Sequence, residues 1–381
     1  MYQPAPVARF LRNRRGGALG YLRQLRGREH SPAVGRPLPS RATGNGSPPE
    51  PPLAATLPGP ATGTPEPRER AGYRLGANEH LAAAIRRSAR EQLDDAIEQL
   101  TEAIDEDPVT AVHEARKCLK KERALLRLVE DSFAPAAYRR ENRSLRDAGR
   151  RMSAARDADV LVETLDELAG RHAARLPAST FAQVRAVLVV DQMRARSVAA
   201  ADRGAVEDVV AELRDARVRI DDWPLAGDEF ALIAGGLGRA YERGAERFER
   251  VLAKPTVDNL HEWRKRVKDL WYHLRLVKPM WPEVLGGQIE QASELADVLG
   301  DDHDLAGLAD RLGEPTVAKR VVADLRPLHE LIDRRRLELQ ARARLLGMRL
   351  YADRPRAYPR RMSRLWEAWR IESAQPPAVW S

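Results

Sequence analysis

A stretch of eighteen residues occurs twice in this chain, and this duplication constrains the fold more than any other feature. Residues 112–129 read VHEARKCLKKERALLRLV, and residues 260–277 read LHEWRKRVKDLWYHLRLV. The two copies align without a gap, and nine of the eighteen positions are identical. Because a repeat kept in register is one structural unit used twice, the sequence predicts an architecture of two related halves.

Each copy has the pattern of an amphipathic helix whose polar face carries charge of one sign. At 100° per residue, the basic residues of the first copy fall within about 120° of one another, opposite Leu119, Leu125 and Leu126. This stripe consists of His113, Arg116, Lys117, Lys120, Arg123 and Arg127. The second copy repeats it with His261, Arg264, Lys265, Lys268 and Arg275, has Trp271 in place of Arg123, and adds Tyr272 to the same face.

A solvated face is the ordinary explanation of a polar stripe, but a solvated face usually mixes signs. Like charges at i and i+4 cost about 0.2–0.5 kcal/mol per pair. Since both copies contain this repulsion, we infer that a polyanion supplies the missing negative charge. The net charge of +8 and the pI of about 9.8 agree with an acidic partner.

Composition indicates an all-α protein. Charged residues make up 31% of the chain and aromatic residues only 5%, while Ala, Leu, Glu and Arg are abundant. The single cysteine, Cys118, excludes an intrachain disulfide and lies on the apolar side of its helix. No run of about 18 apolar residues and no secretory apolar segment is found. We therefore expect no membrane association and a cytoplasmic location.

Proline content and a short linker divide the chain. Residues 31–67 hold eleven prolines, so residues 1–75 are expected to be a disordered basic leader. A functional arm and a misassigned start codon are both open explanations of it. The segment 221–224 separates two helical halves, 76–222 and 223–372, and residues 373–381 form a tail.

Helical periodicity runs almost without interruption from residue 79. Because each half carries the repeat as its second long helix, we predict two antiparallel bundles related by a pseudo-twofold axis, whose stripes line one basic central groove. The predicted helices are 79–106, 109–131, 136–155, 157–171, 178–199, 205–220, 226–253, 256–278, 283–299, 302–312, 316–350 and 358–371.

A second pair of matching segments follows the repeats. Asp157 and Asp302 correspond, as do Asp159 and Asp304. Helix capping by Asp157 and Asp302 is the expected role, because an N-cap carboxylate accepts from unpaired backbone N–H groups. A divalent-cation site at residues 301–304, which read DDHD, is the alternative.

The paired segments resemble the signatures of CHAD domains, the conserved histidine α-helical domains. The resemblance rests on both repeat helices, on SAARDADVLVETL and on LADVLGDDHDLAGL, and covers about residues 73–372. It implies a helical repeat domain whose basic cavity binds inorganic polyphosphate and which can bring proteins to polyphosphate granules. Carried over residue by residue, it points to the two stripes. No Glu-x-Glu-x-Lys motif of a triphosphate tunnel domain precedes residue 80, so we expect neither catalysis nor a cofactor.

Arginine rows on neighbouring helices are further candidates for phosphate binding. One is Arg139, Arg143, Arg146 and Arg150, and another includes Arg239 and Arg243. Arg can grip phosphate oxygens bidentately, and Lys acts as a mobile point charge. Pairing of these rows with nearby Glu is the structural alternative.

The two equivalent histidines have a functional and a structural reading. His113 and His261 are expected to donate to phosphate, and a helix-anchoring hydrogen bond is the alternative. Both are followed by Glu, as in the zinc motif His-Glu-x-x-His, but Lys117 and Lys265 occupy the second His position, which argues against metal.

Three functions from different classes follow. The first is a non-catalytic polyphosphate-binding module, located in the cytoplasm and at polyphosphate granules. The second is a nucleic-acid binder, since other polyanions also fit a basic groove, although few aromatic residues on the stripe could stack on bases. The third is a polyphosphate-processing enzyme that uses Mg²⁺ at residues 301–304.

Overall fold

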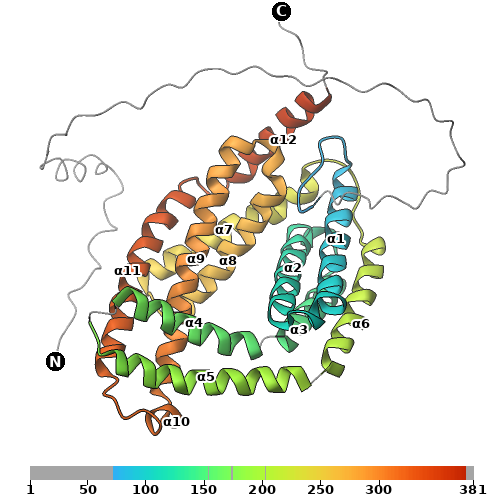
Figure 1. Cartoon of the computed structure of the whole chain (residues 1–381). Coiled ribbons are helices and arrows are strands. Elements are labelled where there is room, and N and C mark those ends of the chain that lie inside the picture. The colour runs from blue at the N-terminus through green and yellow to red at the C-terminus, as the bar shows by residue number, and fades with distance from the viewer. Residues whose placement is uncertain (1–71, 153, 173–174, 202, 375–381) are drawn as a thin grey trace, which may run out of the picture. The chain divides into compact units, whose positions relative to one another are not determined.

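The fold is all-α, as the sequence predicts. The computed structural model describes residues 72–152, 154–172, 175–201 and 203–374, and no strand occurs among them. The α-helices of the first half are α1 (Leu81–Thr101), α2 (Pro108–Leu128), α3 (Pro135–Arg151), α4 (Ala154–His172), α5 (Ala178–Ala201) and α6 (Arg203–Arg219). Those of the second half are α7 (Ala231–Ala253), α8 (Val257–Val277), α9 (Pro282–Gly313), α10 (Pro315–Ala318), α11 (Arg326–Leu350) and α12 (Tyr358–Ala374) (Figure 1).

Capping and proline set the starts of the two repeat helices. Asp107 caps α2 by accepting from the backbone N–H groups of Val109 and Thr110, both at 3.1 Å. Pro108 occupies the first helical position, where its missing N–H costs nothing. Thr256 caps α8 through the N–H of Asn259 at 3.3 Å. The start of each repeat helix is thus set by its own capping residue, Asp107 for α2 and Thr256 for α8.

The helices of the two halves pack in the same order. In the first half, α2 packs between α1 and α3, and α6 lies against α1. In the second half, α8 packs between α7 and α9, and α12 lies against α7 (Figure 1). The two halves meet where α2 contacts α7 and α8, and where α4 contacts α9. The matching order fits the internal repeat, and the pseudo-twofold relation stays a prediction.

Buried apolar side chains form two cores, and neither follows the boundary near residue 222. The larger core draws on α1, α2, α3 and α6 together with α7, α8, α12, the first part of α9 and the end of α11. The smaller core joins α4 and α5 to α10, the end of α9 and the start of α11. All described residues fall in one compact unit, and division into two bundles remains a prediction.

Two predicted helix boundaries are wrong. Residues 283–299 and 302–312 belong to one continuous helix, α9, because no proline follows Pro282 until the helix has ended. The predicted helix 316–350 is instead divided into α10 and α11. Pro327 accounts for this break, because it occupies the first turn of α11 and cannot continue a preceding helix.

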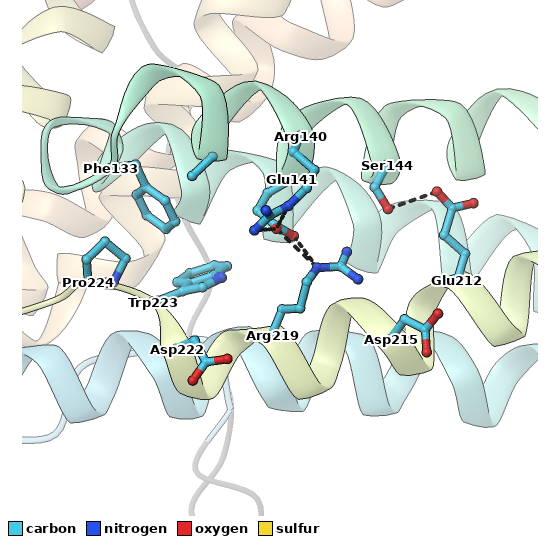
Figure 2. A pocket seen from close by; sticks show the side chains of 11 residues that line it. Phe133, Arg140, Glu141, Ser144, Glu212, Asp215, Arg219, Asp222, Trp223 and Pro224 are labelled. Atoms are coloured by element: carbon cyan, nitrogen blue, oxygen red, sulfur yellow. Dashed lines mark hydrogen bonds and ion pairs between the residues drawn. The ribbon is translucent and has the colours of Figure 1, made fainter.

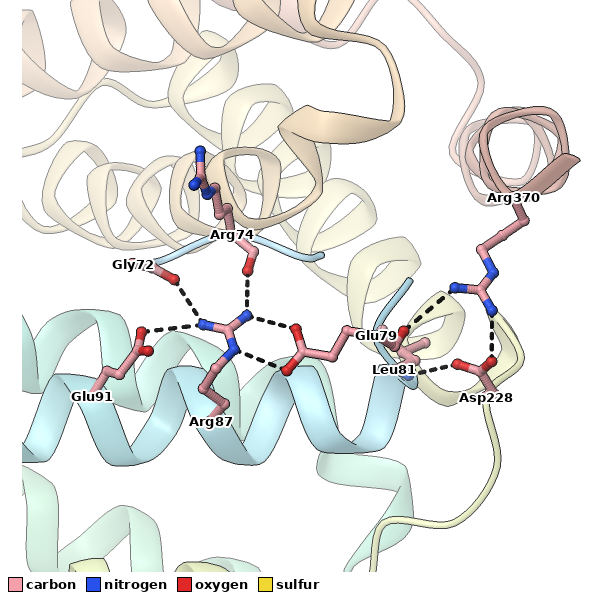
Figure 3. A network of polar contacts seen from close by, with 8 residues as sticks. All are labelled: Gly72, Arg74, Glu79, Leu81, Arg87, Glu91, Asp228 and Arg370. Carbon is pink, nitrogen blue, oxygen red and sulfur yellow. Dashed lines mark hydrogen bonds and ion pairs between the residues drawn. The ribbon is translucent and has the colours of Figure 1, made fainter. Parts of the chain in front are cut away.

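The folded region begins earlier than predicted. Leu75 is only 3% exposed and its N–H donates to the carbonyl of Leu276 at 3.0 Å, so residues 72–75 are not part of a disordered leader. Arg87 secures this segment by donating to the carbonyls of Gly72 and Arg74, at 3.1 and 2.8 Å (Figure 3). Residues 1–71 and 375–381 lie outside the described part of the chain, while the tail's first two residues belong to α12.

The N-terminal end of α1 is also joined to the C-terminal helix. Arg370 of α12 donates to the Ala77 carbonyl at 2.8 Å. It also donates to the Asp228 carboxylate at 2.9 Å (Figure 3). Asp228 also accepts from the N–H of Leu81 at 2.6 Å. This network connects the first and last helices of the unit. None of the described helices is both long and apolar enough to cross a bilayer.

Candidate functional site: a cluster of cations between the repeat helices

Five basic side chains from α2, α4 and α8 come together where the two halves meet. Burial lowers the pKa of Lys120 to about 8, and the charges of Lys268, Arg116, Arg264 and Arg156 lower it further in that order. Four of the five were predicted from the stripes. We call this set, Arg116, Lys120, Arg156, Arg264 and Lys268, the central basic cluster.

The side chain of Lys120 is exposed to water, so a small anion or a chain of anions can reach its amine. Desolvation by surrounding protein is nevertheless the largest cause of its lowered pKa.

Backbone carbonyls hold two of the arginines in place. Nη1 of Arg116 donates to the carbonyl of Met152 at 2.9 Å, at the end of α3. Nε of Arg264 points to the carbonyl of Ala296 on α9 at 3.4 Å. Gly300 permits this approach, because a Cβ there would lie 2.8 Å from Nη2 of Arg264. Neutral carbonyls orient these guanidinium groups without cancelling their charge.

Trp271 organises the far end of the second stripe. The Lys268 amine and the Arg275 guanidinium lie 5.6 and 5.1 Å from its ring centres. Such contacts are attractive because the ring face is electron-rich. The tryptophan that replaces Arg123 of the first copy thus positions two cations instead of adding one.

The histidines differ between the halves. Burial lowers the pKa of His113, with a smaller contribution from Arg156. His261 instead stacks on His303 of α9, with 4.2 Å between ring centres, and burial lowers its pKa to about 4. The Nδ1 atoms of His261 and His303 are both buried without a hydrogen-bond partner among the described residues. The anchoring bond considered for His261 is therefore not formed through this nitrogen.

The remaining end of the first stripe is neutralised by the protein itself. Asp269 of α8 pairs with Arg127 and with Arg266, both at 3.0 Å. Arg123 donates to Asn142 of α3 at 3.2 Å, and burial lowers the pKa of Arg123 to about 10. Since these partners already satisfy the guanidinium groups, this end has less charge to offer a ligand.

Several predicted site residues lie away from the central basic cluster. Lys117 and Lys265 are exposed and pair with Glu114 and Glu262, at 2.8 and 2.7 Å. Arg239 pairs with Asp131 at 2.7 Å, so its partner is acidic but is not the nearby Glu of the structural alternative. Tyr272 is 5% exposed and packs on Tyr73, so its ring belongs to the core. Among the flanking arginines, Arg146 and Arg243 lie near Arg123 and Tyr138, whereas Arg150 is exposed on α3.

Arg139 and Arg143 line a pocket on the α3 side that faces α6. It shares Arg140, Ser144 and Glu212 with a cavity of about 640 Å³ between α3 and α6 (Figure 2). There the buried carboxylate of Glu141 pairs with Arg140 at 2.9 Å and with Arg219 at 3.1 Å. This cavity is lined by residues of both signs and lies apart from the central basic cluster.

The segment 301–304 lies within α9, and the predicted capping role of Asp302 is wrong. Asp302 is 1% exposed and accepts from Nε of Arg336 at 3.1 Å and from Gln340 at 2.8 Å. Asp159 makes the same kind of contact with Gln192 and Arg196 of α5, both at 2.9 Å. Spatially, Asp302 therefore corresponds to Asp159 rather than to Asp157.

Asp157 lies in the first turn of α4, which begins at Ala154, so it is not an N-cap. Burial raises the pKa of both Asp301 and Asp304, and neighbouring Glu167 raises that of Asp301 further. Among the described residues, no three or more His, Cys, Asp or Glu side chains are grouped to hold a metal ion.

Sequence reasoning missed two residues of this region. Arg156 immediately precedes the Asp157 segment, and a cation next to that repeated motif was the available signal. His303 was considered only as a partner of its adjacent carboxylates. No periodicity connects it to His261, because the two lie on different helices that only the tertiary fold brings together.

The fold and this cluster define an all-α repeat protein with a polycationic centre. Its sequence matches the CHAD domain family over residues 77–313, and the chain belongs to that family. The match covers α1 to α9, which include both repeat helices and all five residues of the central basic cluster.

The chain is similar to two solved structures, and the second of them has the same type of fold. The CHAD domain from the plant Ricinus communis is 18% identical, with a TM-score of 0.48 over 74% of this chain and 95% of that chain. PptA from Streptomyces chartreusis is 14% identical, with a TM-score of 0.50 over 72% of this chain and 100% of that chain. No curated protein matches the chain.

Proposed function

We propose that this CHAD domain binds inorganic polyphosphate at the central basic cluster and does so without catalysis. The observation that carries the proposal is the convergence of cations from α2, α4 and α8 around Lys120. Gathering like charges costs free energy in the empty protein. A bound polyanion reverses that cost, because each cation then gains an attractive partner.

Polyphosphate fits this arrangement chemically. It presents closely spaced charged oxygens and no bases, so it requires cations rather than stacking surfaces. Arg116 and Arg264 can each grip two oxygens, whereas Lys120 and Lys268 act as point charges. Arg156 adds a guanidinium that already pairs with Glu163 at 2.8 Å. Because we propose polyphosphate as the ligand, we also propose that the protein is located in the cytoplasm and at polyphosphate granules. Microscopy of a tagged protein tests this location.

A charge-removal experiment tests the site. We expect the quadruple variant R116Q/K120Q/R264Q/K268Q to bind long-chain polyphosphate more weakly and with a flatter salt dependence. The slope of log affinity against log salt should lose roughly 0.7 per lost contact if single-strand behaviour applies. The matched control is K117Q/K265Q, which removes exposed, ion-paired cations of the same two helices. The first variant removes four charges and the control removes two, so equal losses per charge removed would mean that binding follows net charge rather than this cluster.

Nucleic acid is the alternative partner, and competition distinguishes it. Trp271, an aromatic residue at the cluster, already contacts Lys268 and Arg275. Polyphosphate should therefore displace single-stranded RNA of equal charge at near-physiological salt. Equal competition or a base preference would favour the nucleic-acid function. Release of orthophosphate in the presence of Mg²⁺, lost on replacing Asp301 and Asp304 by Asn, would instead show a polyphosphate-processing enzyme.

A further inference from the structure

The cavity between α3 and α6 has a lining unlike that of the central basic cluster. Its volume of about 640 Å³ lies within the range of small-molecule sites, roughly 300–1,000 Å³. Four carboxylates and two guanidinium groups line it, so negative charges exceed positive charges by two. The chain as a whole has a net charge of +8, so this excess is local. The cavity therefore favours a cationic ligand over a polyanion.

One end of the cavity is an aromatic wall. The rings of Phe133 and Trp223 meet edge to face, with 5.5 Å between their centres (Figure 2). The carbonyl of Trp223 accepts from Nη2 of Arg86 at 2.7 Å, which holds this segment against α1. Trp223 is only 4% exposed, and its indole N–H has no hydrogen-bond partner among the described residues. A buried donor without a partner is unfavourable, and an acceptor on a molecule bound at this wall would satisfy it.

Three charged residues on one face of α6 and its continuation line the same cavity. Asp215 and Arg219 belong to α6, and Asp222 ends the short 3₁₀ helix Ile220–Asp222 that follows it. Their spacing of i, i+4 and i+7 places them on one side of the helix, over about 10 Å of its length. Charge thus alternates along this wall as negative, positive, negative.

Arg219 presents free donors in the middle of this wall. Its Nε atom lies 3.1 Å from each oxygen of the Glu141 carboxylate. Glu141 is 3% exposed, so it holds the guanidinium in one orientation. The two terminal nitrogens of Arg219 lie on the side away from Glu141 and donate to no other residue in the described part of the chain (Figure 2). They can therefore grip a carboxylate of a ligand bidentately.

The two aspartates on either side of Arg219 are free as well. Asp215 and Asp222 are exposed and form no hydrogen bond or ion pair with other described residues. Glu212 is by contrast engaged, because it accepts from Ser144 at 2.8 Å and pairs with Arg151. The cavity thus offers a ligand one guanidinium and two carboxylates. A molecule that matches them carries one carboxylate and two cations, which is the charge pattern of a basic amino acid.

We propose that the cavity between α3 and α6 binds a free basic amino acid, arginine in particular. The ligand's α-carboxylate contacts the terminal nitrogens of Arg219, its α-ammonium contacts Asp215, and its side-chain cation lies at Asp222. There the cation also meets the aromatic wall, on which a planar guanidinium stacks better than an ammonium group. The cavity lies apart from the central basic cluster, so arginine binding is a second property of the protein, independent of the proposed function.

Calorimetry of the full chain with arginine and two close analogues tests the ligand. Agmatine lacks the carboxylate of arginine, and citrulline has a neutral side chain of nearly the same shape. Each analogue loses one charged contact, so we expect both to bind at least about tenfold more weakly than arginine. Either analogue binding as tightly as arginine would overturn the inference. So would the absence of saturable arginine binding up to about 10 mM.

The exposed aspartates allow variants that should keep the fold. Asp222→Asn removes the charge that meets the ligand side chain, and we expect about tenfold weaker arginine binding and a loss of the preference over citrulline. The matched control is Asp221→Asn, which removes the neighbouring charge outside the cavity, where Asp221 pairs with Arg90. Equal losses of arginine affinity in the two variants would overturn the site.

Binding of arginine and binding of polyphosphate should be separable. The variant R116Q/K120Q/R264Q/K268Q should bind arginine as wild type does, because none of its replaced residues lines the cavity. D222N should in turn keep its affinity for polyphosphate. Polyphosphate binding that is absent in wild type would overturn only the proposed function. Arginine affinity that falls in the quadruple variant would overturn the assignment of arginine to this cavity.

Discussion

The guanidinium of Arg127 and the carboxylate of Asp269 form an ion pair of 3.0 Å that joins the two repeat helices, α2 and α8. Both side chains are largely buried, and Asp269 also pairs with Arg266 at 3.0 Å. Asp269 occupies the position of Lys121 in the first copy. Asp269, which differs from its equivalent Lys121, thus supplies the negative charge that allows the two basic helices to pack together.

Removal of this carboxylate should destabilise the protein. Asp269→Ala leaves Arg127 and Arg266 without their partner, and we expect the free energy of unfolding to fall by about 2–3 kcal/mol. Urea denaturation monitored by circular dichroism measures the change. The control Glu114→Ala breaks the exposed pair with Lys117 and should cost less than about 1 kcal/mol. Similar costs for the two variants would show that the buried pair is not a link between the halves.

Gly236 should not tolerate a side chain. A Cβ at this position of α7 would overlap the backbone carbonyl of Leu128, at the end of α2. Gly236→Ala is therefore expected to lower the free energy of unfolding by about 1–3 kcal/mol, because backbone must move. Gly286→Ala on α9 is the control, since nothing lies within 4 Å of its added Cβ. That variant should be stabilised by roughly 0.5–1 kcal/mol through helix propensity.

The adjacent imidazoles of His261 and His303 should make the protein less stable in acid. Burial lowers the pKa of His261 to about 4 and also lowers that of His303. Histidines of the unfolded chain take up protons near pH 6.5, so unfolding binds protons below that pH. The free energy of unfolding should fall by about 1–2 kcal/mol from this pair between pH 7 and pH 5.

Denaturant titrations at both pH values measure this loss. The double variant H261Q/H303Q should show a smaller decrease than wild type. A double variant with the wild-type decrease would assign the acid sensitivity to other groups.

Polyphosphate affinity should also strengthen as the medium becomes acidic. At neutral pH the low pKa values of His113 and His261 keep both imidazoles neutral, and a bound polyanion would favour their protonated forms. The affinity should therefore rise as the pH falls from 7 toward 5. Replacing both by Gln should abolish this rise while leaving much of the affinity, which binding titrations across that range measure. A rise that persists in the variant would exclude the histidines from binding.

Trp271 should contribute to binding through the placement of its two cations. Trp271→Leu keeps every charge but removes the ring that lies 5.6 Å from Lys268 and 5.1 Å from Arg275. We expect polyphosphate affinity to fall by roughly two- to fivefold, the loss of about 0.5–1 kcal/mol of cation–π attraction, with an unchanged salt slope. Fluorescence anisotropy with a labelled chain at several salt concentrations separates the two parameters. A flatter slope would mean that the ring also fixes how many contacts form.

The sequence by itself determined the helical class, the duplication, the family and the face of each repeat helix that carries charge. A period of 3.6 residues records on which side of its own helix a residue lies, and that is enough to place Arg116, Lys120, Arg264 and Lys268 on two stripes. The period does not specify which other helix packs against that side. That choice depends on the packing of side chains far apart in the chain.

Only the tertiary structure therefore decided which charges remain available. Packing of α2 against α8 pairs Arg127 of the first copy with Asp269 of the second. Lys120 lies on the same helix as Arg127, but its neighbours are cations. The continuous helix α9 turns Asp302 into the core toward Arg336 and brings His303 onto His261. Charge, burial and proton affinity are set by neighbours in space, and a linear pattern specifies neighbours only along the helix.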